Sequence, residues 1–336
     1  MRSLPSFKFV LLCCSIISLA APLSETVHAD TFSELVKDWE SKAFICETKP
    51  SGVRFPSRPT GEIAQPCDDG DITLFNGLLC AAGVELGCVG VAEAQDPVSG
   101  EWFRSPRIRE HGNDRGGSSL SPDMALGIQL YLIKTLDVDR AAKWLAWLDK
   151  HVPCSIEIFG YCLLEGLPRF CTDDVKEKGC TMRPGDAAQL SATVTFLQET
   201  TGLPRLPDGR LRGYLGTFAG YGPAITDMDS RLNDPGYSQH LVGVSVFLMQ
   251  NMGQRDPRIR SAAERLVEKN PGNAFFTYLK EGKSETVKSE IVARCPSPAT
   301  VLVPPLHQWQ WERENADKAW EHSCYWDCIF AAKLIE

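Results

Sequence analysis

The chain has 336 residues and carries 43 acidic against 35 basic side chains, which gives a formal net charge of −8. Nucleic-acid binding requires a basic face, so this charge argues against DNA or RNA as a partner. The sequence contains neither a Walker-type phosphate loop nor a GxGxxG segment, and we therefore expect no nucleotide and no other cofactor. A chain of this length is long enough for one large helical domain.

The first 29 residues have the features of a secretory signal peptide. Arg2 and Lys8 precede an apolar stretch, and residues 27–29 form a small-residue cleavage site. The stretch is too short for a membrane-spanning helix. No later segment has 18 uninterrupted apolar residues, so we expect no stable membrane insertion. The sequence therefore predicts a secreted or periplasmic protein.

The cysteines favour the same compartment. The chain has 13 of them, and two lie in the predicted signal peptide, which leaves eleven. An exported chain with this many cysteines is expected to form disulfides. The pairs favoured by spacing are Cys46–Cys67, Cys80–Cys88, Cys154–Cys162 and Cys171–Cys180, with Cys295 joined to either Cys324 or Cys328. The sequence does not fix the connectivity, and the odd total leaves at least one thiol outside these pairs.

The chain divides into a lead-in and a helical region. Residues 30–70 are predicted to contain a short helix over residues 31–43, followed by an extended segment rich in proline and glycine. From Asp71 onward, apolar residues recur at helical spacing. A first helix starts near Asp71, and the later ones are predicted over residues 124–136, 138–150, 187–198, 237–252, 257–268 and 316–335. Residues 151–182 form a cysteine-rich insertion, and residues 202–232 are predicted to be a loop.

At least twice, a helix that is apolar on most faces is followed by an amphipathic helix. Residues 124–136 and 237–252 are of the first kind, and residues 138–150 and 257–268 are of the second. The two layers of an α/α barrel need this difference, because the inner ring is covered on both sides. We therefore predict an all-α fold over residues 71–336, an (α/α) toroid of helical hairpins with disulfide-stabilised loops. An open helical solenoid is the alternative.

An acid-containing turn opens into an apolar helix five times along the chain. Asp71, Asp123 and Asp186 stand at the first three openings, 52 and 63 residues apart, and the last two begin at Asn233 and Glu321. Recurrence at such an interval is typical of stacked helical units. If the buried helices are parallel, all five openings lie at one end of the fold. Helix capping is the alternative explanation, and the prolines at positions 122, 184 and 235 strengthen it.

The helix alternation, the export signal and the loops rich in acids and aromatics together resemble the secreted (α/α) toroid enzymes. The resemblance covers residues 70–336. That group comprises six-hairpin glycosidases and α/α polysaccharide lyases, and the resemblance implies a polysaccharide or oligosaccharide substrate. It includes no motif of a specific family, so every candidate site residue rests on local chemistry alone.

Glycoside hydrolysis is the first functional hypothesis. Such enzymes need two carboxylates beside the scissile bond, one of them with a raised pKa. Asp123 is one candidate, and its partner would be Asp234, Glu312 or Asp327. Flat aromatic rings stack on sugars, and the candidate substrate-binding side chains of this kind are Trp102, Trp311 and Trp326.

A polysaccharide lyase is the second hypothesis. It needs a proton-abstracting side chain, for which Tyr237 and His240 are the candidates, and a cation that holds the uronate carboxylate. The arginines considered for that role are Arg104, Arg107 and Arg231. A non-enzymatic envelope protein that binds a glycan or a partner protein is the third hypothesis. The spacing of acids matches no calcium loop, so we assign no metal site.

Overall fold

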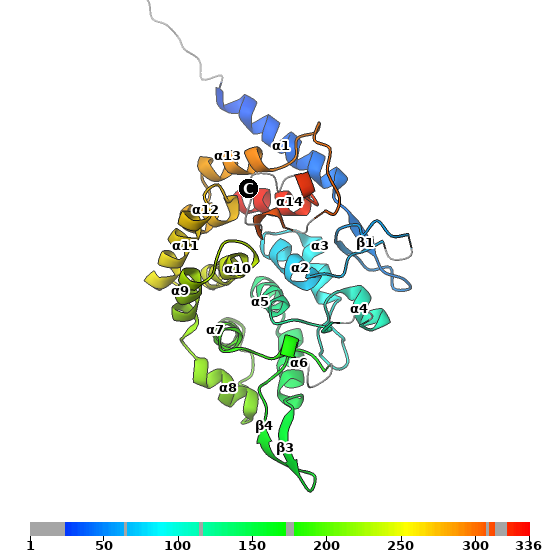
Figure 1. Ribbon diagram of the computed structural model, residues 1–336, viewed down its shortest axis with the longest axis vertical. Coiled ribbons are helices and arrows are strands. Elements are labelled where there is room, and N and C mark those ends of the chain that lie inside the picture. The colour runs from blue at the N-terminus through cyan, green and yellow to red at the C-terminus, as the bar shows by residue number, and fades with distance from the viewer. Residues whose placement is uncertain (1–23, 64–65, 114–116, 173–177, 307–308, 313–320) are drawn as a thin grey trace, which may run out of the picture.

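The computed structural model describes residues 24–63, 66–113, 117–172, 178–306, 309–312 and 321–336. This part of the chain is mostly helical, with two small two-stranded antiparallel sheets (Figure 1). The elements in chain order are α1 (Ser24–Lys42), β1 (Ile45–Glu47), β2 (Arg54–Pro56), α2 (Ile72–Ala81), α3 (Glu85–Ala92), α4 (Pro106–His111), α5 (Met124–Thr135), α6 (Val138–Lys150), β3 (Cys154–Ile158), β4 (Tyr161–Glu165), η1 (Lys178–Cys180), α7 (Pro184–Thr201), α8 (Arg210–Phe218), α9 (Gly222–Leu232), α10 (Tyr237–Asn251), α11 (Pro257–Lys269), α12 (Ala274–Glu281), α13 (Glu285–Arg294), η2 (Gln310–Glu312) and α14 (Trp326–Ile335).

The alternation of buried and amphipathic helices is confirmed. Helix α5 is buried along nearly its whole length, whereas α6 buries one face that includes Trp144, Leu145 and Leu148. Helix α10 is likewise mostly buried, and α11 buries only a stripe that includes Ile259 and Leu266. The apolar pattern of each helix therefore reports how many of its faces other helices cover.

Helices α2 and α5 cross with their backbones in direct contact. A Cβ atom added at Gly77 would overlap the backbone of Gly127, and one added at Gly127 would overlap the backbone of Thr73 and Leu74. Only glycine permits this approach, since any side chain would push the helices apart. The crossing fixes the start of α2 close to the start of α5.

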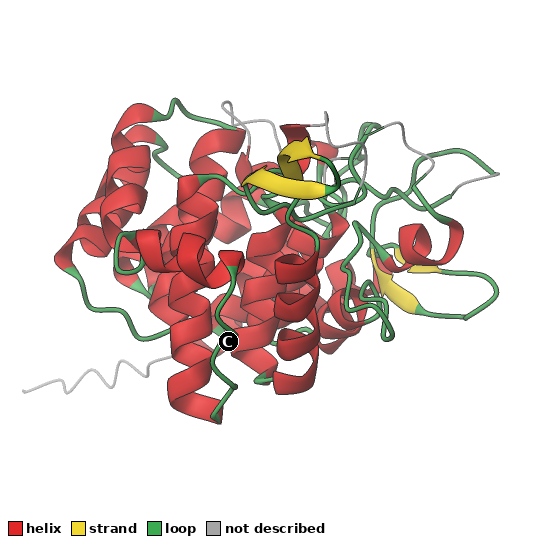
Figure 2. Cartoon of the chain, turned by 90° about the horizontal axis from the view of Figure 1, so that it is seen from below, coloured by secondary structure: helices red, strands yellow, loops and turns green. Residues whose placement is uncertain are grey.

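The remaining helices build outward from this pair. Helix α5 also packs on α7 and α10, and α9 packs on α7, α10 and α11. Helix α14 packs on α1, α12, α13 and α2, so the C-terminal helix returns to the region where the buried helices begin. Figure 2 shows the helices packed side by side, with loops at their ends and the strands at the outside of the fold.

Two segments refine the sequence prediction. The predicted helix over residues 31–43 forms the C-terminal part of α1, which ends at residue 42, and the extended segment after it contains the β-hairpin of β1 and β2. Helix α1 begins at Ser24 and so overlaps the end of the predicted signal peptide, whose residues 1–23 lie outside the described residues. Residues 202–232 hold α8 and α9 rather than a loop, because Pro223 starts a helix there and the glycines masked the helical pattern.

All four disulfides favoured by spacing are present, and Cys295 pairs with Cys328 rather than Cys324. The remaining thiol, Cys324, is buried, and burial raises its pKa. Five disulfides fit an oxidising extracellular or periplasmic environment. Among the described residues, the search for a helix with the length and apolar character of a membrane span finds none.

The glycine crossing generates a stability prediction. Gly127→Ala should lower the free energy of unfolding by about 1–3 kcal/mol, because the added methyl group meets backbone that cannot move aside cheaply. Gly213→Ala in α8 is the matched control, since nothing lies within contact distance of its added Cβ. Alanine there should be neutral or stabilise by up to about 1 kcal/mol through helix propensity. Urea unfolding measures both, and equal effects would show that the crossing is not tight.

Candidate functional site

Three side chains from three helix starts meet at one point. The phenol oxygen of Tyr237, at the first residue of α10, lies 3.3 Å from Asp71 Oδ2 and also contacts Asp123 Oδ2. Asp71 precedes α2, and Asp123 precedes α5. Both carboxylates contact the same hydroxyl oxygen. The Asp71 and Asp123 side chains therefore lie close to each other.

Neither of these aspartates acts as a helix cap through its side chain. Asp71 and Asp123 occupy the N-cap positions of α2 and α5, but neither carboxylate accepts a hydrogen bond from the first helical turn. The Asp123 carboxylate accepts a hydrogen bond from Ser121 as well as from Tyr237. Arg104 Nη1 lies 3.2 Å from Asp71 Oδ1. The capping explanation offered by the sequence therefore fails at these two positions.

The charges at this point hold a proton on Tyr237. Burial raises the pKa of the Tyr237 phenol, and the carboxylates of Asp71 and Asp123 raise it further. The hydrogen bond to Asp123 and the charge of Glu312 in η2 act in the same direction. The phenol is therefore a hydrogen-bond donor that stabilises two anionic neighbours, not a side chain prepared to lose its proton.

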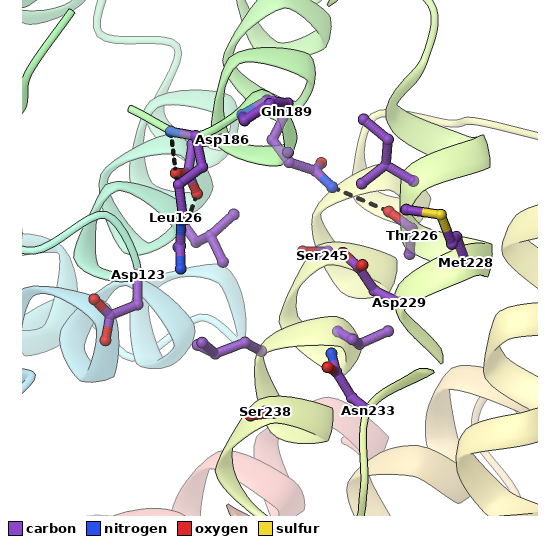
Figure 3. A pocket seen from close by; sticks show the side chains of 16 residues that line it. Asp123, Leu126, Asp186, Gln189, Thr226, Met228, Asp229, Asn233, Ser238 and Ser245 are labelled. Carbon is purple, nitrogen blue, oxygen red and sulfur yellow. Dashed lines mark hydrogen bonds and ion pairs between the residues drawn. The ribbon is translucent and has the colours of Figure 1, made fainter. Parts of the chain in front are cut away.

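A groove of about 470 Å³ extends from Asp123 along the start of α7, the C-terminal half of α9 and the first half of α10, and we call it the aspartate groove. Asp123, Asp186 and Asp229 line it, and Figure 3 shows Asp123 and Asp229 on opposite sides of the opening. A smaller hollow of about 270 Å³ is lined by Tyr237 and shares Asp123 and Arg183 with the groove. The cluster of Tyr237, Asp71 and Asp123 is therefore continuous with the aspartate groove.

Two of the charges in the groove neutralise each other. Arg183, at the N-cap of α7, binds the Asp186 carboxylate with both ends of its guanidinium, at 2.9 and 3.1 Å. Asp186 also accepts the backbone N–H of Arg183 at 2.8 Å, which completes a capping box. The capping explanation is thus correct for Asp186, whose carboxylate is fully occupied by its own helix start.

Asp229 is the carboxyl group of the groove with a perturbed pKa. Burial raises the pKa of Asp229, the charge of Arg183 lowers it, and the charge of Asp186 raises it again. The net effect is a raised pKa, which is the property that a general acid needs near neutral pH. The guanidinium of Arg183 interacts electrostatically with Asp123 and Asp229 alike, so both acids lie near it.

The sequence-predicted partners of Asp123 fall in three different places. The charge of Glu312, in η2, helps to raise the pKa of the Tyr237 phenol. Asp327 is fully buried at the start of α14, where it accepts hydrogen bonds from Ser323 Oγ at 2.6 Å and from the backbone of Cys328. Asp234 is exposed and does not line the aspartate groove. Of the three, only Glu312 acts on the charges around Tyr237, and none of them is among the described residues that line the aspartate groove.

The predicted aromatic subsites are part of the core instead. Trp102, Trp311 and Trp326 are at most 5 % exposed, so their ring faces are covered by protein. Each indole N–H donates to a backbone carbonyl, which is a structural role. Large aromatics bury more apolar area than other side chains, and in this chain that property decides their position.

The predicted lyase residues divide in the same way. Tyr237 is at the site, but His240 is fully buried among the rings of Tyr237, Phe275 and Trp309. Arg107 pairs with the buried Asp69, and Arg231 pairs with Asp227 one helical turn away. Of the three predicted arginines, Arg104 reaches the site, where it binds Asp71.

The sequence interpretation missed Asp71, Arg183, Asp186 and Asp229 as site residues. Asp71 and Asp186 were visible as members of the repeated acid-then-helix pattern, which the structure brings together at one end of α2, α5, α7 and α10. Asp229 stands in an acid-rich stretch of the sequence, but residues 202–232 were predicted to be a loop, which gave no reason to place it beside the other helix starts. Within the described residues, no cluster of histidine, cysteine or acidic side chains has the geometry of a metal site.

No known protein family, curated protein or solved structure matches this chain. The function has to be inferred from the chemistry of the site itself.

The electrostatics of Asp229 can be tested directly. Carboxyl ¹³C NMR should give a pKa above the ordinary value of 3.8. Arg183→Ala should raise it further by removing a positive charge, whereas Asp186→Asn should lower it by removing a negative one. Opposite shifts in the two variants are the expected result, and shifts in the same direction would contradict the charge arrangement.

Proposed function

We propose that this protein is a glycoside hydrolase whose catalytic carboxyl groups are Asp123 and Asp229. The supporting observation is that these two acids face one groove from opposite sides, and that burial raises the pKa of Asp229 while hydrogen bonds hold Asp123. Two carboxyl groups that face one groove, one of them with a raised pKa, are what glycosidic bond hydrolysis requires.

The roles follow from these differences. Asp229 donates its proton to the glycosidic oxygen as the bond from that oxygen to the anomeric carbon breaks. Asp123 accepts a proton from the water that attacks the anomeric carbon. The products are an alcohol and a hemiacetal, and the enzyme ends with Asp229 deprotonated and Asp123 protonated. Tyr237 is a positioning residue, because its hydroxyl bridges Asp71 and Asp123 and touches neither reacting bond in this scheme.

The site is less suitable for a polysaccharide lyase. A lyase base must lose a proton, whereas the surroundings of Tyr237 raise its pKa. A uronate carboxylate would also meet three aspartates in the groove, and Arg183 is already bound to Asp186. The non-enzymatic alternative is an envelope protein that binds a glycan or a partner protein. Only a measurement of hydrolytic activity distinguishes it from the hydrolase.

The proposal includes the architecture and the compartment. We propose that α2, α5, α7, α10 and α14 are the inner helices of an (α/α) toroid, supported by the contact of α14 with α2 and the shared position of the helix starts. Export through the signal peptide at residues 1–29 is supported by the disulfides.

Substitution of the two acids tests the hydrolase. Asp123→Asn and Asp229→Asn should each lower kcat by about 10²–10⁴-fold on a glycan that the parent hydrolyses, measured by release of reducing ends. Asp234→Asn is the matched control, because Asp234 is exposed and lies outside the groove. If no glycan in a broad panel is hydrolysed by the parent, or if all three variants behave alike, the hydrolase proposal is wrong.

Loss of the Tyr237 hydroxyl should have a smaller and different effect. Tyr237→Phe removes a hydrogen bond to a charged group, which corresponds to about a 10–100-fold loss in kcat with KM little changed. A purely structural role would instead lower the free energy of unfolding and leave the kcat of the folded enzyme unchanged. Tyr221→Phe, at an exposed tyrosine, is the control. An unchanged kcat would remove Tyr237 from the positioning role.

A further inference from the structure

The hairpin of β3 and β4 carries a concentration of exposed apolar side chains. Seven large apolar residues between positions 156 and 167 are exposed to solvent: Ile156, Ile158, Phe159, Tyr161, Leu163, Leu164 and Leu167. The hairpin projects from the lower end of the fold, and neither strand packs closely on any described helix (Figure 1). Single exposed apolar residues are ordinary, but a contiguous set on a projecting element indicates a surface that binds an apolar partner.

Most of these side chains share one face of the hairpin. Ile156 and Ile158 alternate with Glu157 along β3, so the two isoleucines lie on one face and the carboxylate lies on the other. Across the ladder, the partners of these isoleucines are Leu164 and Tyr161, which extend the apolar face onto β4. The hairpin is therefore amphipathic, and the side chains of its apolar face remain exposed.

The turn of the hairpin holds an aromatic residue that the fold does not need. Phe159 and Gly160 form a two-residue turn, with φ of 51° and 80°. Such a turn favours asparagine or aspartate before the glycine, because a bulky residue is strained at positive φ. The Phe159 side chain is 97 % exposed, so packing within the protein does not offset this strain. An aromatic ring at this position is suited to contact with a partner outside the chain.

A disulfide maintains the hairpin without a core. An isolated two-stranded hairpin is marginally stable at best in water. Cys154 and Cys162, eight residues apart in the chain, join β3 to β4. The cross-link restricts the unfolded segment, so the apolar face persists although no helix supports it. The hairpin is thus a preformed surface and needs no partner in order to fold.

The size and composition of this surface favour lipid over protein. A stable protein–protein interface uses about 20–30 residues on each side, whereas the hairpin offers seven large apolar side chains, so a second copy would bury too little. Protein interfaces are also enriched in arginine, and residues 154–165 include no basic residue. A lipid surface requires only a few aliphatic and aromatic side chains that enter its interfacial layer to a depth of about 5–10 Å.

We propose that the β3–β4 hairpin binds reversibly to the surface of a zwitterionic lipid membrane, with its apolar face and Phe159 in the interfacial layer. Glu157, on the opposite face, stays in water, and the hairpin has no cation that would attract anionic headgroups. The contact is adsorption of a few side chains and does not cross the bilayer. It is independent of the proposed hydrolase, because no residue of the hairpin lines the aspartate groove.

Sedimentation with phosphatidylcholine vesicles tests the inference. The parent protein should bind, and its affinity should change little when phosphatidylglycerol is added or the ionic strength is raised, because the attraction is apolar. Phe159→Asn should weaken binding by about tenfold or more, the loss expected when one aromatic side chain is no longer buried. The fold of this variant should persist, since asparagine is favoured at this turn, and thermal unfolding checks it.

A matched pair of serine variants separates the hairpin from general exposure of apolar groups. Ile158→Ser should weaken vesicle binding, because it removes a side chain from the apolar face. Val301→Ser should leave binding unchanged, because Val301 is 83 % exposed but follows α13, near the opposite end of the fold (Figure 1).

Three results would overturn the inference. The first is a parent that does not bind phosphatidylcholine, or a Phe159→Asn variant that binds as the parent does. The second is binding to anionic vesicles alone that is lost at high salt, which would assign the contact to charge. The third is a dimer, seen by ultracentrifugation without lipid, that Phe159→Asn dissociates, which would assign the hairpin to a second copy. None of these results changes the hydrolase proposal, which reducing-end release tests separately.

Discussion

The site depends on the backbone contact at which α2 crosses α5, through Gly77 and Gly127. The glycines lie within one to two helical turns of the helix starts, a span of about 6–9 Å at 1.5 Å per residue. Over so short a distance the two helices diverge little, so Asp71 and Asp123 end close together. Larger residues at the crossing would separate the two carboxylates, and Tyr237 could no longer contact both. The geometry of the candidate site is therefore specified inside the core, by two glycines.

Bringing two carboxylates together has an energetic cost that the site has to offset. Two like charges a few ångströms apart repel by on the order of 2–4 kcal/mol in a partly solvated position. The Tyr237 hydroxyl supplies a proton between them, and Arg104 supplies a positive charge on the far side of Asp71. The positive ends of α2 and α5 add to this stabilisation, because both acids sit at helix N-termini. The same arrangement raises the pKa of Tyr237, because a phenolate would be repelled by the carboxylates of both Asp71 and Asp123.

Sequence periodicity predicted the buried and peripheral helices, and cysteine spacing predicted the disulfides, because both depend on local patterns. The same reasoning could not identify which of these carboxylates contact another helix and do not cap their own. Asp71, Asp123 and Asp186 occupy similar positions at helix starts, yet only Asp186 caps its own helix. What distinguishes the other two is a partner 166 or 114 residues away in the chain. The sequence prediction missed helices α8 and α9, because glycines and Pro223 are typical of turns. Tertiary packing nevertheless stabilises both segments as helices.

The acids of this chain can be separated by where their hydrogen-bond donors come from. Asp327 receives a donor from Ser323, four residues away, and Asp186 receives donors from the residue that starts its helix. Asp227 receives donors from Arg231 in its own helix and from Arg265 in α11. Such carboxylates are already satisfied by protein donors and have little capacity for a ligand. The Asp123 carboxylate accepts from Ser121 nearby and from Tyr237 on a distant helix, and the Asp229 carboxylate receives no donor from the described residues. Retaining a half-buried carboxyl group without a donor is unfavourable for folding, and its position in the wall of a groove makes a ligand the natural source of the missing interaction. Of the two acids proposed to be catalytic, Asp229 is thus the one that the fold leaves incompletely satisfied.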